Sequence, residues 1–431
     1  MNKLTFKHWL SFIVAGLIGQ FAWTIENMFI NRYLFYTTGR LDFIAPTVAL
    51  SASTATLTTL FMGVLSDRIG KRKIFISFGY IIWGITIIAF AFLNPHQFGF
   101  LQNSLFLTGV LIVMMDCLMT FFGSTANDAA FNAYVTDVTN NDNRGKVESV
   151  LSILPLVAML IIFGFFNGLT IGENPQWTLF YFIFGVLTII AGVVSLFVIP
   201  KEKIKPNKEE PYIKNIFHGF RPSTIKNNKM LYLVMIAFCI FSIAIQIFFP
   251  YFLIYIEKNL GIVDFDYIIT LGSVLLVACI ITVVIGLFMD KIGKTKLLIP
   301  ALAVTILGAI LMFFATRMAF IIIAGIILMS GYMVSTAVLN AKIRDYTPSN
   351  EAGLFQGIRM VFAVLIPMVT GPYIGEALYK SNPETYLNEY NQLVTLPNAN
   401  IFLGAAVALV VAIIPIIFII INEKRLKDAT K

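Results

Sequence analysis

The chain has 431 residues, of which 58% are hydrophobic and only 13% are charged. Soluble domains carry roughly 25% charged residues, so this composition excludes an ordinary water-soluble protein. The apolar residues, including 40 phenylalanines, form continuous runs, which also excludes disorder and the alternating pattern of a β-barrel. We therefore expect an all-α membrane protein.

Twelve apolar runs follow one another, each long enough to cross the hydrocarbon core as a helix of about 20 residues. The first run follows Lys3 and Lys7, but it is longer than a signal peptide core and lacks a small-residue cleavage site, so we expect it to remain as the first span. The predicted spans are residues 9–36, 43–64, 73–93, 104–135, 147–169, 177–199, 230–256, 266–289, 296–316, 318–341, 354–378 and 399–421.

A long polar stretch separates the first six spans from the last six. We therefore predict an N-terminal six-helix bundle at residues 1–200, a cytoplasmic linker at 201–229 and a C-terminal six-helix bundle at 230–431. The net charge of +8 is typical of nucleic-acid binding when it is clustered, but here 25 of the 31 basic residues fall on one side of the predicted membrane. By the positive-inside rule, both termini are cytoplasmic in a multi-pass protein of the cell membrane, and we expect no nucleic-acid partner.

The three cysteines, Cys117, Cys239 and Cys279, lie inside predicted spans and show neither a disulfide pattern nor metal-ligand spacing. We expect no cofactor and no bound metal. The expected partners are the lipid bilayer and a small-molecule substrate, and we expect a monomer.

The two halves of the chain repeat two motifs. Residues 63–73 read GVLSDRIGKRK between spans two and three, and residues 286–296 read GLFMDKIGKTK between spans eight and nine. After spans four and ten, Asn132, Asp137 and Gly145 recur as Asn340, Asp345 and Gly353. These pairs predict two parallel six-helix repeats, the architecture of secondary transporters whose substrate site lies between the halves.

The repeated loop and the 6+6 layout resemble the major facilitator superfamily over essentially the whole chain. Residues 127–145, from Asn127-Asp128 to Arg144-Gly145, are similar to the fourth helix and following loop of the glycoside-pentoside-hexuronide:cation symporters. That resemblance implies a sugar transporter. Those symporters typically carry acidic cation ligands in helix two, whereas residues 43–62 contain no Asp or Glu, so we expect H⁺ as the coupling ion and keep Na⁺ as an alternative.

Three acidic residues lie well inside predicted spans, away from the span ends, where each charge costs about 3 kcal/mol on insertion scales. Glu26 lies in the first span, and Asp116 and Asp128 lie in the fourth. A carboxylate in such a place can bind and release a proton or Na⁺. We therefore predict that Glu26, Asp116 and Asp128 couple ion movement to transport, and that a structural ion pair or interhelical hydrogen bond is the alternative for each. The second half has no acid in mid-span, so we expect the first half to handle the ion.

Polar side chains on the first and fourth spans predict a substrate site. At 100° per residue, Asp116, Thr120, Gly123 and Asn127 share one face of the fourth span, and Ser124, Asp128 and Asn132 form a second stripe. An aromatic ring beside amides suits a sugar, because its apolar face stacks on the ring while its hydroxyls bind the amides. The predicted substrate-binding residues are Gln20, Trp23, Asn27, Asn31, Asn127 and Asn132 in the first half, with Gln246, Tyr251 and Tyr332 in the second.

The repeated loops carry a second prediction, which rests on the resemblance. It implies that Asp67 with Arg68 and Arg72, and Asp290 with Lys291, hold the cytoplasmic side shut by charge pairing and by facing helix N-termini. We add Asp137 and Asp345 to these gating residues. The alternative is that the basic residues only orient the chain in the membrane.

The sequence contains no Walker lysine loop, no His-Glu-x-x-His and no Gly-x-Ser-x-Gly, so we expect a transporter and no enzyme. We predict alternating-access transport of a small polar solute, in first place a sugar or glycoside. Two alternatives stay open. One is a proton-coupled exporter of hydrophobic compounds, which the phenylalanine content permits, and the other is a membrane sensor or membrane enzyme that transports nothing.

Overall fold

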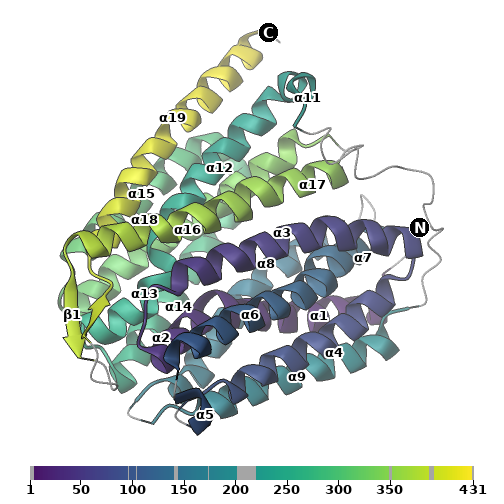
Figure 1. The fold of residues 1–431 in the computed structure, drawn as a ribbon. Helices are drawn as coiled ribbons and strands as arrows, with labels where there is room; N and C mark the ends of the chain where they lie inside the picture. The colour runs from purple at the N-terminus through teal and green to yellow at the C-terminus, as the bar shows by residue number, and fades with distance from the viewer. Residues whose placement is uncertain are drawn as a thin grey trace. The chain divides into compact units, whose positions relative to one another are not determined.

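The computed structural model describes residues 4–429, apart from residues 96, 103, 140–143, 173, 201–219, 349–351 and 388–392. Within these residues the secondary structure is helical except for one two-stranded sheet (Figure 1). Twelve of the described helical stretches are long and apolar enough to cross a membrane. The predicted all-helical, twelve-span fold is therefore confirmed.

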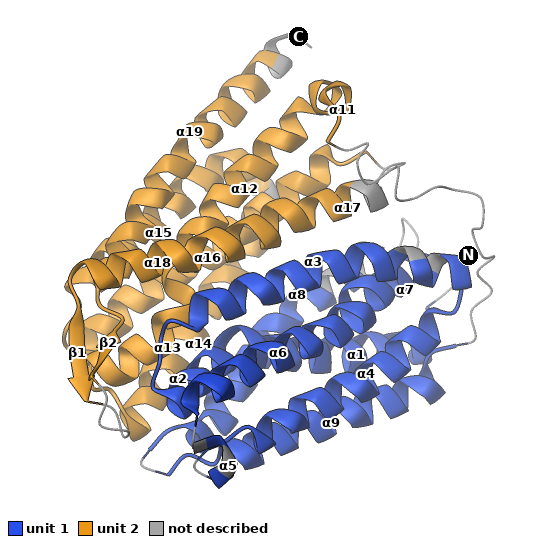
Figure 2. Cartoon of the chain, in the orientation of Figure 1, with its two compact units in different colours: residues 1–210, 388–392 blue, residues 211–387, 393–431 orange. Residues whose placement is uncertain are grey.

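The chain divides into two compact units, shown in blue and orange in Figure 2. Unit 1 comprises residues 1–210 with 388–392, and unit 2 comprises residues 211–387 with 393–431. The division falls inside the predicted linker. Residues 201–219 of that linker lie outside the described residues, and a short helix and the start of the seventh span occupy the rest.

Unit 1 contains the first six spans, and several of them combine α-helical, π-helical and 3₁₀ segments. Its helices are α1 (Phe6–Thr24), η1 (Ile25–Ile30), α2 (Asn31–Thr38), α3 (Ile44–Ile69), α4 (Arg72–Ala89), η2 (Phe90–Phe92), α5 (Gly99–Gln102), α6 (Leu105–Gly123), η3 (Ser124–Phe131), α7 (Asn132–Val138), α8 (Arg144–Ile161), η4 (Ile162–Phe166), η5 (Asn167–Thr170) and α9 (Trp177–Val198).

Unit 2 contains the last six spans and a β-hairpin. Its elements are α11 (Pro222–Asn227), α12 (Lys229–Phe248), η6 (Phe249–Tyr251), α13 (Phe252–Ile254), η7 (Tyr255–Asn259), α14 (Asp264–Ile292), α15 (Lys294–Phe314), α16 (Met318–Tyr346), α17 (Ala352–Met360), η9 (Val361–Leu365), α18 (Ile366–Ser381), β1 (Glu384–Leu387), β2 (Leu393–Leu396) and α19 (Asn400–Ala429).

The spans pack closely wherever a glycine replaces a side chain at the helix crossing. In unit 1, α4 packs along α9, and a Cβ on Gly84 would lie 2.5 Å from the carbonyl oxygen of Gly185. In unit 2, a Cβ on Gly375 of α18 would lie 2.1 Å from the carbonyl oxygen of Ile247 in α12. Because lipid provides no hydrophobic drive between helices, such close backbone contact is a main source of their association.

The hairpin is the one departure from the predicted all-helical secondary structure. β1 and β2 pair antiparallel, with Glu384 opposite Leu396 and Leu387 opposite Leu393. The Thr, Tyr and Val residues of these strands favour extended backbone. Within unit 2, Figure 1 shows the hairpin at the end of the helices away from α11 and the C-terminus.

Two π-helical segments interrupt the spans that carry the predicted ion-coupling residues. η1 contains Glu26, and η3 contains Asn127 and Asp128. π-Helical turns within α-helices are rare and occur frequently at functional sites. They also shift the helical register, so a face predicted at 100° per residue does not continue unchanged through them.

Candidate functional site

Three spans of unit 1 bring Glu26, Ser51 and Thr120 into one hydrogen-bonded cluster. The three side chains come from η1, α3 and α6, respectively, and the residues are 7%, 3% and 0% exposed. Oγ of Ser51 donates to Oε1 of Glu26 at 2.6 Å, and Oγ1 of Thr120 donates to the same oxygen at 2.8 Å. The two hydroxyl oxygens lie 3.0 Å apart. One carboxylate oxygen of Glu26 is therefore held by two hydroxyls from two other helices.

Asp116 extends this cluster by one helical turn of α6. It is 2% exposed, and its charge interacts with that of Glu26. Oε2 of Glu26 and Oδ1 of Asp116 are both buried without a hydrogen-bond partner among the described residues. Two ionised carboxylates would repel each other in this low-dielectric place. The arrangement can therefore take up and release a proton.

Asp128 lies further along the same span in a more open setting. Its residue is only partly buried, and its Oδ2 accepts a hydrogen bond from Oγ of Ser124 at 3.0 Å. Its backbone carbonyl accepts a bond from Nδ2 of Asn132 at 3.1 Å. The charge of Asp128 also acts on Glu26, so the three predicted acids form one electrostatic group.

A second cluster in unit 1 joins Trp23, Trp83, Asn127 and Tyr80. Nε1 of Trp23 donates to Oδ1 of Asn127 at 3.2 Å, and Nδ2 of Asn127 donates to Oη of Tyr80 at 2.7 Å. The rings of Trp23 and Trp83 lie 5.1 Å apart. Oη of Tyr80 donates to the carbonyl of Ala15 at 2.5 Å. Asn127 is thus buried and bonded on both sides, whereas Trp23 remains partly exposed.

The predicted polar face of the fourth span is shared between different neighbours. Thr120 turns to Glu26 and Ser51, whereas Asn127 turns to Trp23 and Tyr80. A Cβ on Gly123 would lie 2.7 Å from the ring of Trp83, so this glycine is the site where the indole packs on the helix.

Three of the other predicted substrate residues of unit 1 donate hydrogen bonds to the backbone of their own span. Nδ2 of Asn27 donates to the carbonyl of Trp23 at 2.8 Å, and Nδ2 of Asn31 donates to the carbonyl of Asn27 at 3.4 Å. Gln20 and Asn27 are partly buried, Asn31 is 2% exposed, and Asn132 is exposed. Gln20 and Asn27 therefore remain accessible candidates, while the amide of Asn31 is enclosed.

The predicted substrate residues of unit 2 are held in helix contacts. Tyr251 is fully buried, and its Oη donates to the carbonyl of Pro372 at 2.9 Å. Gln246 packs against Gly371, where an added Cβ would lie 2.4 Å from Cβ of Gln246. The ring of Tyr332 stacks on Phe241 at 6.2 Å. Gln246 and Tyr332 are partly buried, so of the three only Tyr251 is enclosed.

Among the described side chains, two predicted gating residues pair with each other in unit 1, and one pairs with a neighbouring lysine in unit 2. In unit 1, Nε of Arg72 lies 2.9 Å from Oδ2 of Asp137, and its Nη1 donates to Oγ of Ser66 at 2.6 Å. In unit 2, Nζ of Lys294 lies 2.7 Å from Oδ2 of Asp345. Arg68 and Lys291 are exposed, and the side chains of Asp67 and Asp290 lie outside the described residues.

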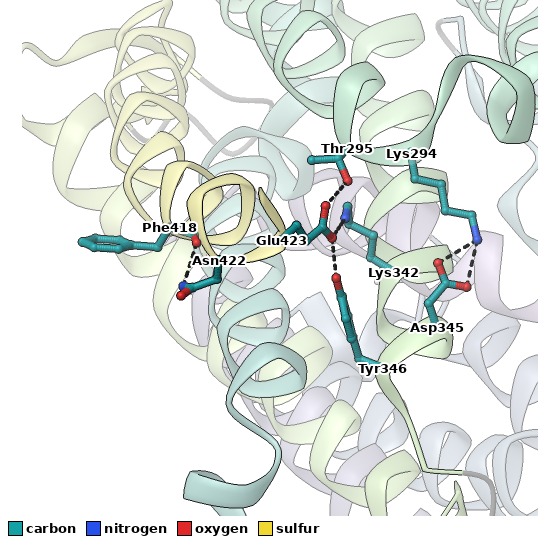
Figure 3. A network of polar contacts seen from close by, with 8 residues as sticks. All are labelled: Lys294, Thr295, Lys342, Asp345, Tyr346, Phe418, Asn422 and Glu423. Atoms are coloured by element: carbon teal, nitrogen blue, oxygen red, sulfur yellow. Dashed lines mark hydrogen bonds and ion pairs between the residues drawn. The ribbon is translucent and has the colours of Figure 1, made fainter. Parts of the chain in front are cut away.

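Figure 3 shows a network that the sequence analysis did not identify. The carboxylate of Glu423 in α19 accepts hydrogen bonds from Lys342 at 2.5 Å, from Thr295 at 2.5 Å and from Tyr346. The Lys342 side chain is 3% exposed. The only sequence signal was the presence of a charge at the end of each of these spans. For Ser51, the signal was a run of six hydroxyl residues at 51–59, namely Ser51, Ser53, Thr54, Thr56, Thr58 and Thr59.

The chain matches a known protein family and, among individual proteins, uncharacterized transporters. The sequence model of the Major Facilitator Superfamily matches residues 9–372 and also residues 234–431. An uncharacterized transporter of Buchnera aphidicola subsp. Schizaphis graminum is 26% identical over 316 residues, which cover 69% of this chain and 67% of the relative. An uncharacterized MFS-type transporter of Methanocaldococcus jannaschii is 32% identical over 141 residues, which cover 32% of this chain and 30% of that protein.

Solved structures share the fold at low sequence identity. A mutant of the nucleoside transporter NupG has a TM-score of 0.67 at 13% identity, covering 95% of this chain and 99% of that one. The xylose transporter XylE from E. coli, in a partially occluded inward-open conformation, has a TM-score of 0.67 at 12% identity, covering 94% and 95%. Family match, twelve spans and shared fold agree, and this chain belongs to the Major Facilitator Superfamily.

Proposed function

We propose that this transporter carries a small polar solute, in first place a sugar or glycoside, by alternating access coupled to H⁺. Its place is the cell membrane, with both termini in the cytoplasm, as the distribution of basic residues indicates. The observation that carries the proposal is the buried pair of carboxylates formed by Glu26 and Asp116, held by the hydroxyls of Ser51 and Thr120.

Proton coupling follows from the chemistry of that pair. A buried carboxylate pair changes its charge by one when it loses a proton, and the cost of burying that charge links the protonation state to the conformation of the protein. The second span contributes the hydroxyl of Ser51 and no carboxylate. Fewer anionic ligands favour a proton over Na⁺, which remains the alternative.

The aromatic and amide groups of unit 1 support a sugar-like solute. Trp23 is partly exposed and lies beside Trp83, with the amides of Asn27 and Gln20 on the same span. This combination of a flat apolar ring and hydrogen-bonding groups suits a ring that carries hydroxyls. The shared fold with transporters named for nucleosides and xylose is consistent with such a solute.

The test is uptake by the purified full-length protein in liposomes. Radiolabelled D-xylose, D-glucose, a β-glucoside and uridine would be offered under an inward pH gradient, an inward Na⁺ gradient or neither. We expect accumulation of at least one of these solutes above the external concentration, dependent on the pH gradient. Accumulation under Na⁺ alone would assign the coupling to sodium.

Two outcomes would contradict the proposal. If none of the sugars or the nucleoside enters while a hydrophobic cation such as ethidium is expelled, the protein is an exporter of hydrophobic compounds. If no solute moves under any gradient, the transport proposal itself fails. The matched control is Glu376→Gln, which removes a carboxylate that is paired with Lys380 near a span end and lies outside the buried cluster.

A further inference from the structure

Four polar residues spaced four apart form a stripe along the fourth span. Asp116, Thr120 and Ser124 follow one another four residues apart, which places them on one face of α6 and the first residue of η3. Asp128 lies in η3, and its hydrogen bond with Ser124 continues the stripe. Asp116, Thr120 and Ser124 are buried, with exposed fractions of 2%, 0% and 0%. Asp128 is only partly buried. The stripe therefore runs from a closed end at Asp116 to a more open end at Asp128.

Each end of the stripe holds a carboxylate, and hydroxyls lie between them. At the closed end, Thr120 donates to Glu26, whose charge interacts with Asp116. At the open end, Oγ of Ser124 donates to Oδ2 of Asp128 at 3.0 Å. A hydroxyl group both donates and accepts, so it can pass a proton on by accepting one and releasing its own.

The buried pair needs such a connection if it binds the coupling proton, because neither carboxylate is exposed. Side chains four residues apart on a helix have Cβ atoms about 5–6 Å apart, a gap that one water molecule bridges between the hydroxyls of Thr120 and Ser124. A proton from water would bind Asp128 and pass to the hydroxyl of Ser124, which would release its own proton to the bridging water. That water would protonate the hydroxyl of Thr120, which would release its own proton to Glu26. Release runs in reverse, and no other reactant is consumed.

We propose that Asp128 is the residue through which the buried pair of Glu26 and Asp116 exchanges its proton with water, and that Ser124 positions it. This inference rests on the proposed proton coupling and gives Asp128 a role different from that of the two buried acids. Other described titratable groups that interact with these acids include Cys117, Tyr80 and Tyr181, a thiol and two phenols. Thiols and phenols are ordinarily uncharged at pH 7, and Asp128 is the only described carboxylate of this group that is not buried.

Infrared spectroscopy of the full-length protein in liposomes tests the exchange without a substrate. The carbonyl stretch of a protonated carboxyl group shifts when its proton is replaced by deuterium, so the shift after transfer to D₂O reports the exchange rate. Glu26→Gln identifies the band of the buried pair by removing it. We expect Asp128→Asn to keep this band and to slow its shift at least about tenfold, as for the loss of a proton-transfer group.

Further variants separate proton transfer from a structural role. Asp128→Glu should restore most of the exchange rate, and Ser124→Ala should slow exchange less than Asp128→Asn does. Glu376→Gln, which removes a carboxylate of unit 2 that is paired with Lys380, is the matched control and should leave the rate unchanged. The amide exchange of the spans should be the same in all variants, which shows that they are folded.

Three results would overturn the inference. An unchanged rate in Asp128→Asn would show that protons reach the pair by another route. Loss of the band in Asp128→Asn would show that Asp128 itself holds the proton. If the wild-type protein has no band that Glu26→Gln removes, the pair is not protonated, and both this inference and the proton coupling fail.

Discussion

The two units differ in where they bury carboxylates. Among the described carboxylates only Glu26 and Asp116 are buried, and both lie in the middle of spans of unit 1. Among the described residues of unit 2 the buried charge is Lys342, at the end of α16, where it pairs with Glu423 of α19 at 2.5 Å. A charge near the membrane centre is costly and is usually retained for function, whereas a pair near the end of a span can tie helices together.

In the two repeats, the equivalent aspartates form ion pairs with different basic residues. Asp137 and Asp345 are equivalent by the repeat, yet Asp137 pairs with Arg72 and Asp345 pairs with Lys294. The position equivalent to Arg72 is Thr295, which donates to Glu423. The aspartate is therefore the same in both halves, while the basic partner has moved by one position. The repeat preserves the helical frame, and the chemistry attached to it has diverged.

The largest effect is expected from a variant that removes the buried carboxylate of Glu26 in unit 1. Glu26→Gln removes the carboxylate that we propose to bind the coupling proton, so ΔpH-driven accumulation of solute should be lost completely. Wild-type protein coupled to one proton can accumulate solute up to about tenfold per pH unit, and the variant should only equilibrate it. Steady-state uptake in liposomes measures this ratio. Glu376→Gln in unit 2 should behave as wild type, and equal loss in both variants would remove the distinction between the units.

The second prediction concerns the buried pair of unit 2. Lys342→Met leaves the carboxylate of Glu423 without its cation, which should lower the free energy of unfolding by about 3 kcal/mol. The double variant Lys342→Met with Glu423→Met removes both charges and should recover most of that loss. Unfolding by SDS in mixed micelles gives these free energies. If the double variant is as unstable as the single one, the pair acts through packing and not through charge.

The spans were predictable because hydrophobicity along one helix is a local property. All twelve appear near their predicted positions, and Glu26, Asp116 and Asp128 stood out because ionisable residues are rare inside a membrane. The partners were not predictable. Ser51 and Thr120 are common in membrane helices, and periodicity within one span does not reveal which other span it contacts.

The same reason explains why the network of Glu423 was not predicted. Lys342 and Glu423 are 81 residues apart, and each looks like an ordinary charge that orients its span. The π-helical segments η1 and η3 also have no clear composition of their own, so their positions could not be predicted. As a result, Thr120 and Asn127, which were predicted to share one face, contact different neighbours in the structure. Contacts between distant segments depend on packing, which a single sequence does not display.

The third prediction concerns the loop pair of unit 1. Nε and Nη1 of Arg72 bind two different acceptors, Asp137 and Ser66, which the single ammonium group of a lysine reaches less well. Arg72→Lys should therefore lower the free energy of unfolding by about 1.5 kcal/mol. The matched control is Arg68→Lys in the same loop, where the residue is exposed and no change is expected. An equal effect at both positions would contradict the specific role of Arg72.

The smallest effect is expected for the equivalent pair of unit 2. The side chains of Lys294 and Asp345 are 25% and 48% exposed, and such pairs contribute about 0.2–1 kcal/mol. Lys294→Ala should lower the free energy of unfolding by about 0.5 kcal/mol, and high salt should remove the difference from wild type, because salt screens exposed charges. The effect of Arg72→Lys should persist in the same salt, since the side chain of Arg72 is 7% exposed. A loss above about 2 kcal/mol for Lys294→Ala, or one insensitive to salt, would place the two loop pairs in the same class.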